Sequence, residues 1–200
     1  MGQRLVITIE NNKEKLCNIY YHWSAYTRAA LEEVRDVINC IYDHNDETKE
    51  ELLLRLIRFC EHNGGGISGI SEEFEYIQKL YPNETFKQDN YSRNNGLIAL
   101  SEQGMIDQQR WSEGDVYINL DEDNVDFCVY AGYENLDEYV ENRAEWDDEF
   151  DINNLGDIPK LDCCLGYFDT DEIDDVIAEL DSVQGSYVVQ CGSEICELIE

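Results

Sequence analysis

Carboxylates are the charged groups that this sequence supplies in greatest number, and most of them lie in its second half. Residues 101–200 contain 29 acidic and 3 basic side chains, residues 1–100 contain 16 acidic and 11 basic ones, and the chain has a formal net charge of −31. A field of this sign repels nucleic acids and anionic membranes and attracts basic surfaces. The charge therefore predicts a basic protein partner, with no direct contact to nucleic acid or membrane.

The acids between Glu113 and Asp181 occupy positions that local patterns turn outward. In the segment 134–148 they recur at spacings of four and three, which lines one face of a helix. In the segment 115–129 apolar and polar residues alternate, so the acids of two strands face away from the core. Such rows of carboxylates can engage the lysines and arginines that hold nucleic-acid phosphates. The candidate partner-binding residues are Glu134, Asp137, Glu138, Glu141, Glu145, Asp148, Asp121, Asp123, Asp126, Asp171 and Asp175.

Two other interpretations of these acids stay open. One is a solvated face that keeps the chain soluble. The other is calcium binding, because Asp121–Asp123 and Asp169–Asp171 begin as calcium loops do. Val125 and Ile173 occupy the next ligand position, however, and no glycine stands at the sixth. These departures argue against an EF-hand, and no metal site is predicted.

A second constellation lies in the first half, where residues 20–27 (YYHWSAYT) join a strand to a helix. Helix N-termini present free amides to anions, and a histidine can serve as acid, base or ligand. The alternative ligand site is Arg4, His22, Arg93, Arg110 and Trp111, for a phosphorylated small molecule. The competing interpretation is that the aromatic residues are core and His22 is structural.

No catalytic motif accompanies these groups. There is no HExxH, no GxSxG and no lysine after the glycines at 64–66, so no enzyme activity and no cofactor are predicted. The eight cysteines form no CxxC pair, which favours reduced thiols in a cytosolic protein. No apolar run reaches 18 residues and no leader precedes the first strand, so neither a membrane span nor a secreted product is expected.

The elements of the first half follow from hydrophobic periodicity. The segments 4–10 and 16–23 alternate and predict an antiparallel hairpin. Three helices follow: one from Ser24 or Thr27, one after Asp46, and one over 71–81. In the third we expect Ser71 as the cap and Phe74, Ile77 and Leu80 inward. Residues 83–95 are expected to form a loop and 96–100 a short strand.

The second half predicts an acidic hairpin with helices. Strands are expected at 115–121, 125–129, 161–168 and 187–191, and helices at 135–146 and after the capping residues 169–172. The fold class is therefore α+β, with an N-terminal hairpin and three helices followed by the acidic half. We expect parts 1–100 and 101–200, with a weakly marked boundary that is also compatible with one domain.

Four runs, GQRLVITI, YYHWSAYT, RNNGLIALSEQGM and RWSEGDVYINLD, resemble a family of small acidic phage and mobile-element proteins of Gram-positive bacteria. The resemblance covers most of residues 2–131. It implies an anti-defence role of the anti-CRISPR or anti-restriction kind, in the cytoplasm of the bacterial host. It carries no motif that assigns a site residue.

These observations lead to one expected function and two alternatives. We expect a non-enzymatic inhibitor that mimics DNA and occupies the basic channel of a host defence nuclease. The first alternative is a nucleotide or small-molecule binding protein, or a hydrolase, with its site near His22 and Arg110. The second is an acidic adaptor that recruits a basic partner without inhibiting it. The oligomeric state is left open.

Overall fold

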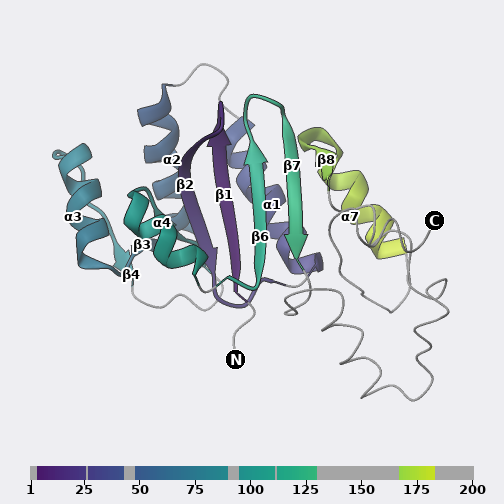
Figure 1. Ribbon diagram of the computed structural model, residues 1–200, viewed down its shortest axis with the longest axis horizontal. Coiled ribbons are helices and arrows are strands. Elements are labelled where there is room, and N and C mark those ends of the chain that lie inside the picture. Colours follow the sequence, from purple (N-terminus) through teal and green to yellow (C-terminus); the bar gives the residue numbers. More distant parts are fainter. Residues whose placement is uncertain are drawn as a thin grey trace, which may run out of the picture.

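The computed structural model describes residues 4–25, 27–42, 48–89, 95–110, 112–129 and 167–182. In these residues helices flank one eight-stranded sheet of mixed parallel and antiparallel pairing, in the order β4-β3-β5-β2-β1-β6-β7-β8 (Figure 1). The strands are β1 (Leu5–Asn11), β2 (Glu14–Tyr21), β3 (Gly66–Ser68), β4 (Gln88–Asp89), β5 (Leu97–Ala99), β6 (Gly114–Asn119), β7 (Asn124–Val129) and β8 (Tyr167–Asp169). The helices are α1 (Thr27–Tyr42), α2 (Lys49–His62), α3 (Ser71–Leu80), α4 (Glu102–Gln109), the short 3₁₀ helix η2 (Thr170–Glu172) and α7 (Ile173–Ser182). A mixed α and β fold is confirmed, and the sheet is larger than the sequence predicts.

The centre of the sheet is the antiparallel pair β1 and β2. Both residues of its turn have positive φ, 51° at Asn12 and 64° at Lys13, which is the geometry of a type I′ turn that suits a two-residue hairpin. Along β1 the alternation turns Leu5, Ile7 and Ile9 to one face, and all three are fully buried.

The second half of the chain extends this same sheet. β6 lies parallel to β1 with Leu5 opposite Gly114, and β7 and β8 follow in antiparallel pairing. Val116, Ile118, Val125 and Phe127 alternate inward and are fully buried in the cluster that includes the apolar face of β1. Strands from both sides of residue 100 therefore share one sheet and one core.

The two faces of the sheet are covered differently (Figure 1). α1 and α2 pack on the apolar face, and α7 lies beside α1. α4 lies over β2 and β5 on the opposite, more polar face. There the Asn18 side-chain amide donates to the Met105 carbonyl at 3.1 Å, and the Thr8 hydroxyl donates to Asn18 Oδ1 at 2.9 Å. These bonds satisfy the polar groups that α4 buries.

Helix ends show why some predicted boundaries differ from the structure. α2 begins with a capping box, in which the Thr48 N–H donates to the Glu51 carboxylate at 2.8 Å and the Glu51 N–H donates to Thr48 Oγ1 at 3.3 Å. α2 ends ahead of Gly64, whose φ of 89° is a conformation that glycine adopts without steric cost. The predicted Ser71 cap is wrong, because Ile70 occupies that position without a side-chain bond.

The predicted inward position of Leu80 is also wrong, since Leu80 is 48% exposed. α3 packs on the sheet through β3, and its buried residues are Glu73 and Ile77. Its buried stripe is therefore too narrow to include the last turn. The short strands β3 and β4 and the helix α4 were not predicted, and β4 lies inside the segment expected to be a loop. The elements predicted at 135–146 and 187–191 lie outside the described residues.

Among the helices that the described ranges contain, none combines the length and the apolar character that crossing a bilayer requires. In the same ranges Cys17, Cys40 and Cys60 are free thiols. Burial raises the pKa of Cys17 and Cys60, so both are protonated and unreactive at neutral pH.

Candidate functional site

Two acidic segments that lie far apart in the sequence meet at one edge of the sheet. The antiparallel pairing of β7 and β8 sets Asp169 opposite Asn124. The Thr170 N–H donates to the Asp123 carbonyl at 2.8 Å, which fixes the start of η2 and α7 beside the β6–β7 turn. We call this region the acidic edge, and its residues are Asp121, Glu122, Asp123, Asp126, Asp171 and Asp175. All six are exposed.

Ordered neighbours hold the acidic edge in place. The Asn12 N–H donates to Asp121 Oδ1 at 2.9 Å, which ties the β6–β7 turn to the β1–β2 turn. The Tyr42 hydroxyl donates to Asp123 Oδ1 at 2.9 Å, which ties the same turn to the end of α1. Asp126 lies within β7, opposite Tyr117 of β6. The carboxylates are therefore displayed from hydrogen-bonded backbone.

The acidic edge is poorly compensated by positive charge. Segments 112–129 and 167–182 contain no lysine or arginine. Arg35 contacts Asp174 at 3.6 Å, but within the described ranges Asp126, Asp171 and Asp175 have no cationic partner. Partial desolvation by neighbouring atoms raises the pKa of Asp126, although its side chain is exposed.

The other predicted partner-binding residues lie outside the described residues. They are Glu134, Asp137, Glu138, Glu141, Glu145 and Asp148. Their expected arrangement on one helical face stays a prediction. Of the predicted set, Asp121 and Asp123 lie in the β6–β7 turn, and the Thr170–Asp123 hydrogen bond holds Asp171 of η2 beside that turn. Asp126 lies in β7 on the face opposite Val125 and Phe127, and Asp175 lies in α7, which packs on the face of the sheet that those two residues share.

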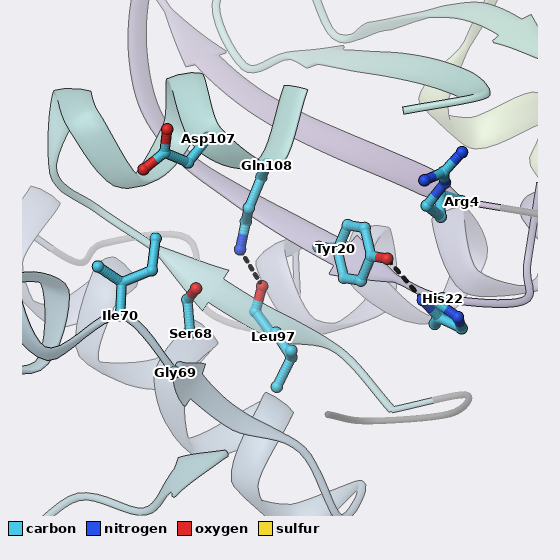
Figure 2. Close-up of a pocket in the computed structure, with 9 residues that line it drawn as sticks. All are labelled: Arg4, Tyr20, His22, Ser68, Gly69, Ile70, Leu97, Asp107 and Gln108. Atoms are coloured by element: carbon cyan, nitrogen blue, oxygen red, sulfur yellow. Dashed lines mark hydrogen bonds between the residues drawn. The ribbon is translucent and has the colours of Figure 1, made fainter. Parts of the chain in front are cut away.

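A separate cavity of about 520 Å³ opens on the polar face of the sheet (Figure 2). Its size falls within the range of about 300–1,000 Å³ that is common for small-molecule sites. Residues of β2, the β3–α3 connection, β5 and α4 converge on it, together with the residue before β1 and the residue after β2. The lining residues are Arg4, Tyr20, His22, Ser68, Gly69, Ile70, Leu97, Asp107 and Gln108.

Arg4 and His22 form one end of this cavity. Arg4 makes a two-pronged ion pair with Glu113, with NH2 3.0 Å from Oε1 and Nε 3.1 Å from Oε2. The Tyr20 hydroxyl lies 2.7 Å from Nδ1 of His22. Burial and the adjacent Arg4 lower the pKa of His22 below its ordinary value. The imidazole is therefore neutral at pH 7 and acts in hydrogen bonding rather than as a charge.

Asp107 and Gln108 form the opposite end. Gln108 is buried, and its Nε2 donates to the Leu97 carbonyl at 2.8 Å. A carbonyl only accepts, so this bond fixes the amide orientation. Gln108 Oε1 is buried in the same wall and accepts no hydrogen bond in the described structure. The Asp107 carboxylate lies 3.9 Å from Arg110 and accepts from Gln103 at 3.0 Å.

The predicted alternative ligand site is thus partly assembled by the fold. Arg4 and His22 line the cavity together. Arg110 is not one of the lining residues, although its guanidinium lies 3.9 Å from the carboxylate of Asp107, which is. Arg93 and Trp111 lie outside the described residues. Sequence reasoning missed the walls contributed by the segment 68–70 and by α4, because nothing local indicates that they face Arg4.

One buried carboxylate connects the two cavity walls that α4 and the segment 68–70 form. Glu73 of α3 is 1% exposed, and it accepts the N–H of Leu100 at 2.7 Å and the N–H of Ser101 at 3.2 Å. It also accepts the Ser101 hydroxyl, and Ser101 Oγ in turn accepts the Gly104 N–H at 3.0 Å as the N-cap of α4. The start of α3 and the start of α4 are therefore positioned together.

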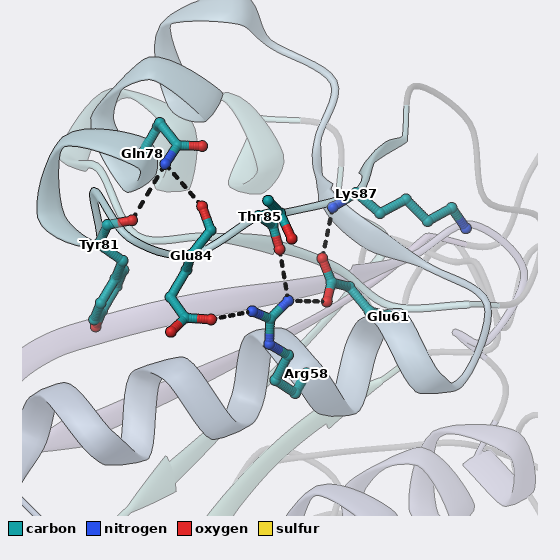
Figure 3. Close-up of polar contacts among 7 residues, drawn as sticks. All are labelled: Arg58, Glu61, Gln78, Tyr81, Glu84, Thr85 and Lys87. Carbon is teal, nitrogen blue, oxygen red and sulfur yellow. Dashed lines mark hydrogen bonds and ion pairs between the residues drawn. The ribbon is translucent and has the colours of Figure 1, made fainter.

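A network centred on Arg58 holds the outer end of the sheet (Figure 3). The Arg58 guanidinium donates to the Glu61 and Glu84 carboxylates at 2.6 Å each and to the Thr85 carbonyl at 2.8 Å. Glu61 also accepts the Lys87 N–H at 2.6 Å. This network attaches the α3–β4 connection to α2. It thereby also supports β4 and its partner β3, which leads into the segment 68–70.

In the described part of the chain, no three histidine, cysteine or carboxylate side chains converge as ligands of a metal ion do. Comparisons with protein-family models, curated proteins and solved structures found no match for this chain.

Proposed function

We propose that this protein is a non-enzymatic inhibitor that mimics DNA and occupies the basic nucleic-acid-binding channel of a host defence protein, of the anti-CRISPR or anti-restriction type. One observation carries the proposal. The fold gathers two acidic segments, 121–126 and 171–175, at one edge of the sheet, in stretches of sequence that contain no lysine or arginine.

Physical chemistry favours this role over a merely solubilising one. Self-repulsion among many like charges destabilises a folded protein, and solubility needs far less than a net charge of −31. Asp121, Glu122 and Asp123 follow one another in the β6–β7 turn, and Asp126 follows in β7. Carboxylates repeated along such a segment offer arginines and lysines a substitute for phosphates.

The negative electrostatic field of the chain also acts at a distance, before the inhibitor touches its partner. A strongly negative surface accelerates encounter with a basic channel, and salt screens the attraction over about 10 Å at 0.1 M. The inhibitor would therefore bind quickly and weaken as salt rises. It would not bind nucleic acid itself, because both carry negative charge.

A cleavage assay tests this proposal. Purified bacterial CRISPR effector nucleases and restriction endonucleases would be titrated with the full chain, and cleavage of duplex DNA would be measured. We expect stoichiometric inhibition of at least one of these enzymes, and expect its loss in the triple variant Asp126→Lys, Asp171→Lys, Asp175→Lys. Unchanged inhibition by the triple variant would show that the acidic edge is not the inhibitory surface.

A matched control distinguishes the effect of the acidic edge on inhibition from the effect of net charge. Glu72, Glu75 and Glu102 are exposed acids on α3 and α4, and reversing all three to lysine changes the net charge by the same amount. We expect this control to inhibit as the native chain does. The acidic adaptor remains a distinct outcome of the assay: such a protein would bind the nuclease while cleavage continues.

A further inference from the structure

We propose that the polar face of the sheet at β7 and β8, where the Tyr167 ring lies near the carboxylates of Glu122 and Asp126, receives an arginine side chain of a basic partner protein. The inference takes the positive charge of the partner from the function proposed above, on which it rests. It adds the residue type that the partner presents and the place where that residue binds.

Strand pairing places an aromatic ring on each side of one carboxylate. Asp126 of β7 lies opposite Tyr117 of β6 and opposite Tyr167 of β8. Residues that lie opposite one another in neighbouring strands point to the same face, with Cβ atoms about 4.5–5.5 Å apart. The polar face therefore carries a row of tyrosine, aspartate and tyrosine across three strands.

A buried asparagine holds the Tyr167 end of this row. Asn124 is 2% exposed, and its side-chain amide donates to the Tyr167 hydroxyl and, at 3.1 Å, to Glu122 Oε2. Asn119 Nδ2 donates to Asn124 Oδ1 at 2.9 Å, which fixes the orientation of that amide. The Tyr167 side chain thus begins opposite Asp126 and ends near Glu122, so a carboxylate lies near each end of the ring.

The group is accessible to another protein. Tyr167 is 60% exposed, and Glu122 and Asp126 are exposed as well. Within the described ranges neither carboxylate has a cationic partner. Figure 1 shows α4 on this face beside β2, well away from β8. An exposed aromatic ring between two uncompensated carboxylates is complementary to a cation that also has a flat surface.

The chain builds the same combination of groups around an arginine of its own. The Arg58 guanidinium carbon lies 5.0 Å from the centre of the Phe86 ring. The same guanidinium donates to the carboxylates of Glu61 and Glu84 at 2.6 Å each. One ring and two carboxylates therefore suffice, in this fold, to hold a guanidinium by its flat surface and by its edge.

Arginine fits the polar face better than lysine does. A planar guanidinium can stack on the Tyr167 ring while its in-plane N–H groups reach Glu122 and Asp126. An ammonium is a point charge that gains little from a flat surface. Cations do bind on this face, since the Lys15 ammonium lies 5.3 Å from the centre of the Tyr117 ring. The Tyr167 ring should therefore add a preference for arginine to the general attraction for positive charge.

Titration of the full chain with two peptides of equal charge, hexa-arginine and hexa-lysine, tests the inference by calorimetry at about 150 mM salt. We expect Tyr167→Leu to weaken binding of the arginine peptide about threefold, the scale of one exposed cation–π contact. The lysine peptide should bind this variant almost as it binds the native chain. Tyr167→Phe keeps the ring and should retain the arginine affinity. Asp126→Asn should weaken both peptides, because either cation pairs with the carboxylate.

A second tyrosine provides the matched control. Tyr76 of α3 is 42% exposed and lies outside this group, so Tyr76→Leu should leave both affinities unchanged. Nuclear magnetic resonance of the chain with ring-labelled tyrosine localises the contact. The signal that disappears in Tyr167→Leu identifies the Tyr167 ring, and the arginine peptide should shift this signal more than the Tyr76 signal.

Two results would overturn the inference. They are native affinity of Tyr167→Leu for the arginine peptide, and a Tyr167 ring signal that does not shift when that peptide is added. Neither measurement requires a nuclease. An arginine preference that depends on Tyr167, combined with no inhibition of any nuclease, would therefore refute the inhibitory function and support this contact surface.

Discussion

Arg4 and Glu113 pair across the junction of β1 and β6, with NH2 3.0 Å from Oε1 and Nε 3.1 Å from Oε2. The Arg4 backbone N–H also donates to Oε2 at 3.0 Å. Arg4 lines the cavity and Glu113 directly precedes β6, so this ion pair fixes the start of β6 beside one end of the cavity.

The Arg4–Glu113 pair should make stability depend on pH. Its hydrogen bonds and the Arg4 charge outweigh burial and lower the pKa of Glu113. A lowered folded-state pKa stabilises the protein above the ordinary pKa of about 4.5, and that contribution is lost as the pH falls through the folded value. We expect Glu113→Gln to cost about 1–2 kcal/mol in urea unfolding at pH 7 and much less at pH 3. Glu75→Gln, an exposed control, should cost little at either pH, and an equal cost of Glu113→Gln at both would contradict the electrostatic account.

Glu33 should show the opposite pH dependence. Burial, together with Asp36 and Glu32, raises the pKa of Glu33 to about 7 despite a bond from Ser24 Oγ at 3.1 Å. Because the folded pKa exceeds the unfolded one, the folded state holds the proton longer and stability falls as the pH rises from about 4.5 to 7. We expect Glu33→Gln to raise the free energy of unfolding at pH 8 by about 1–3 kcal/mol. At pH 4 it should have little effect, and a variant less stable at pH 8 would refute the prediction.

Glu73 should be the most sensitive carboxylate for the fold of the cavity walls. Glu73→Ala leaves the N–H groups of Leu100 and Ser101 unsatisfied, which costs about 3 kcal/mol for a buried site. Glu73→Gln keeps one acceptor oxygen and should cost about 1 kcal/mol. Urea unfolding measures both values. Equal stability of the alanine variant and the native chain would mean that Glu73 does not hold α3 and α4 together.

Arg58 should stabilise the outer end of the sheet. Arg58→Met removes three hydrogen bonds. It also removes the cation–π contact with Phe86, in which the guanidinium carbon lies 5.0 Å from the centre of the ring. Because Arg58 is 38% exposed, solvent screens the ion pairs, and we expect a loss of about 1–2 kcal/mol. Lys79→Met, at an exposed position of α3, is the control and should cost less than about 0.5 kcal/mol. Hydrogen exchange should localise the Arg58→Met effect to β3 and β4.

The sequence predicts the parts of the fold that carry a strong period. Leu5, Ile7 and Ile9 occupy alternate positions of β1, and Val116 and Ile118 alternate with polar residues in β6, because one side of each strand faces the core. The strands β3 and β4 are too short to show a period. α4 buries Gly104 and Gln108 rather than large apolar side chains, so it lacks the apolar stripe by which a helix is identified.

The residues of the candidate sites divide in the same way, into those that local patterns reveal and those that only long-range pairing positions. Arg4, His22 and the exposed acids were identified because their charges and outward positions are visible locally. Glu73 and the segment 68–70 were missed because their roles depend on the pairing of β3 with β5, a contact that no local pattern encodes. The meeting of Asp123 with Thr170 likewise depends on the long-range pairing of β7 with β8.

The salt dependence of inhibition tests the central claim most directly. The dissociation constant for the inhibited nuclease would be measured from about 50 to 200 mM salt, for the native chain and for the triple variant Asp126→Lys, Asp171→Lys, Asp175→Lys. If the acidic edge replaces DNA phosphates, the native affinity falls at least about tenfold over this range, and duplex DNA displaces the inhibitor. The variant binds more weakly, with a shallower salt dependence. A native affinity that is independent of salt and of competing DNA would contradict the account.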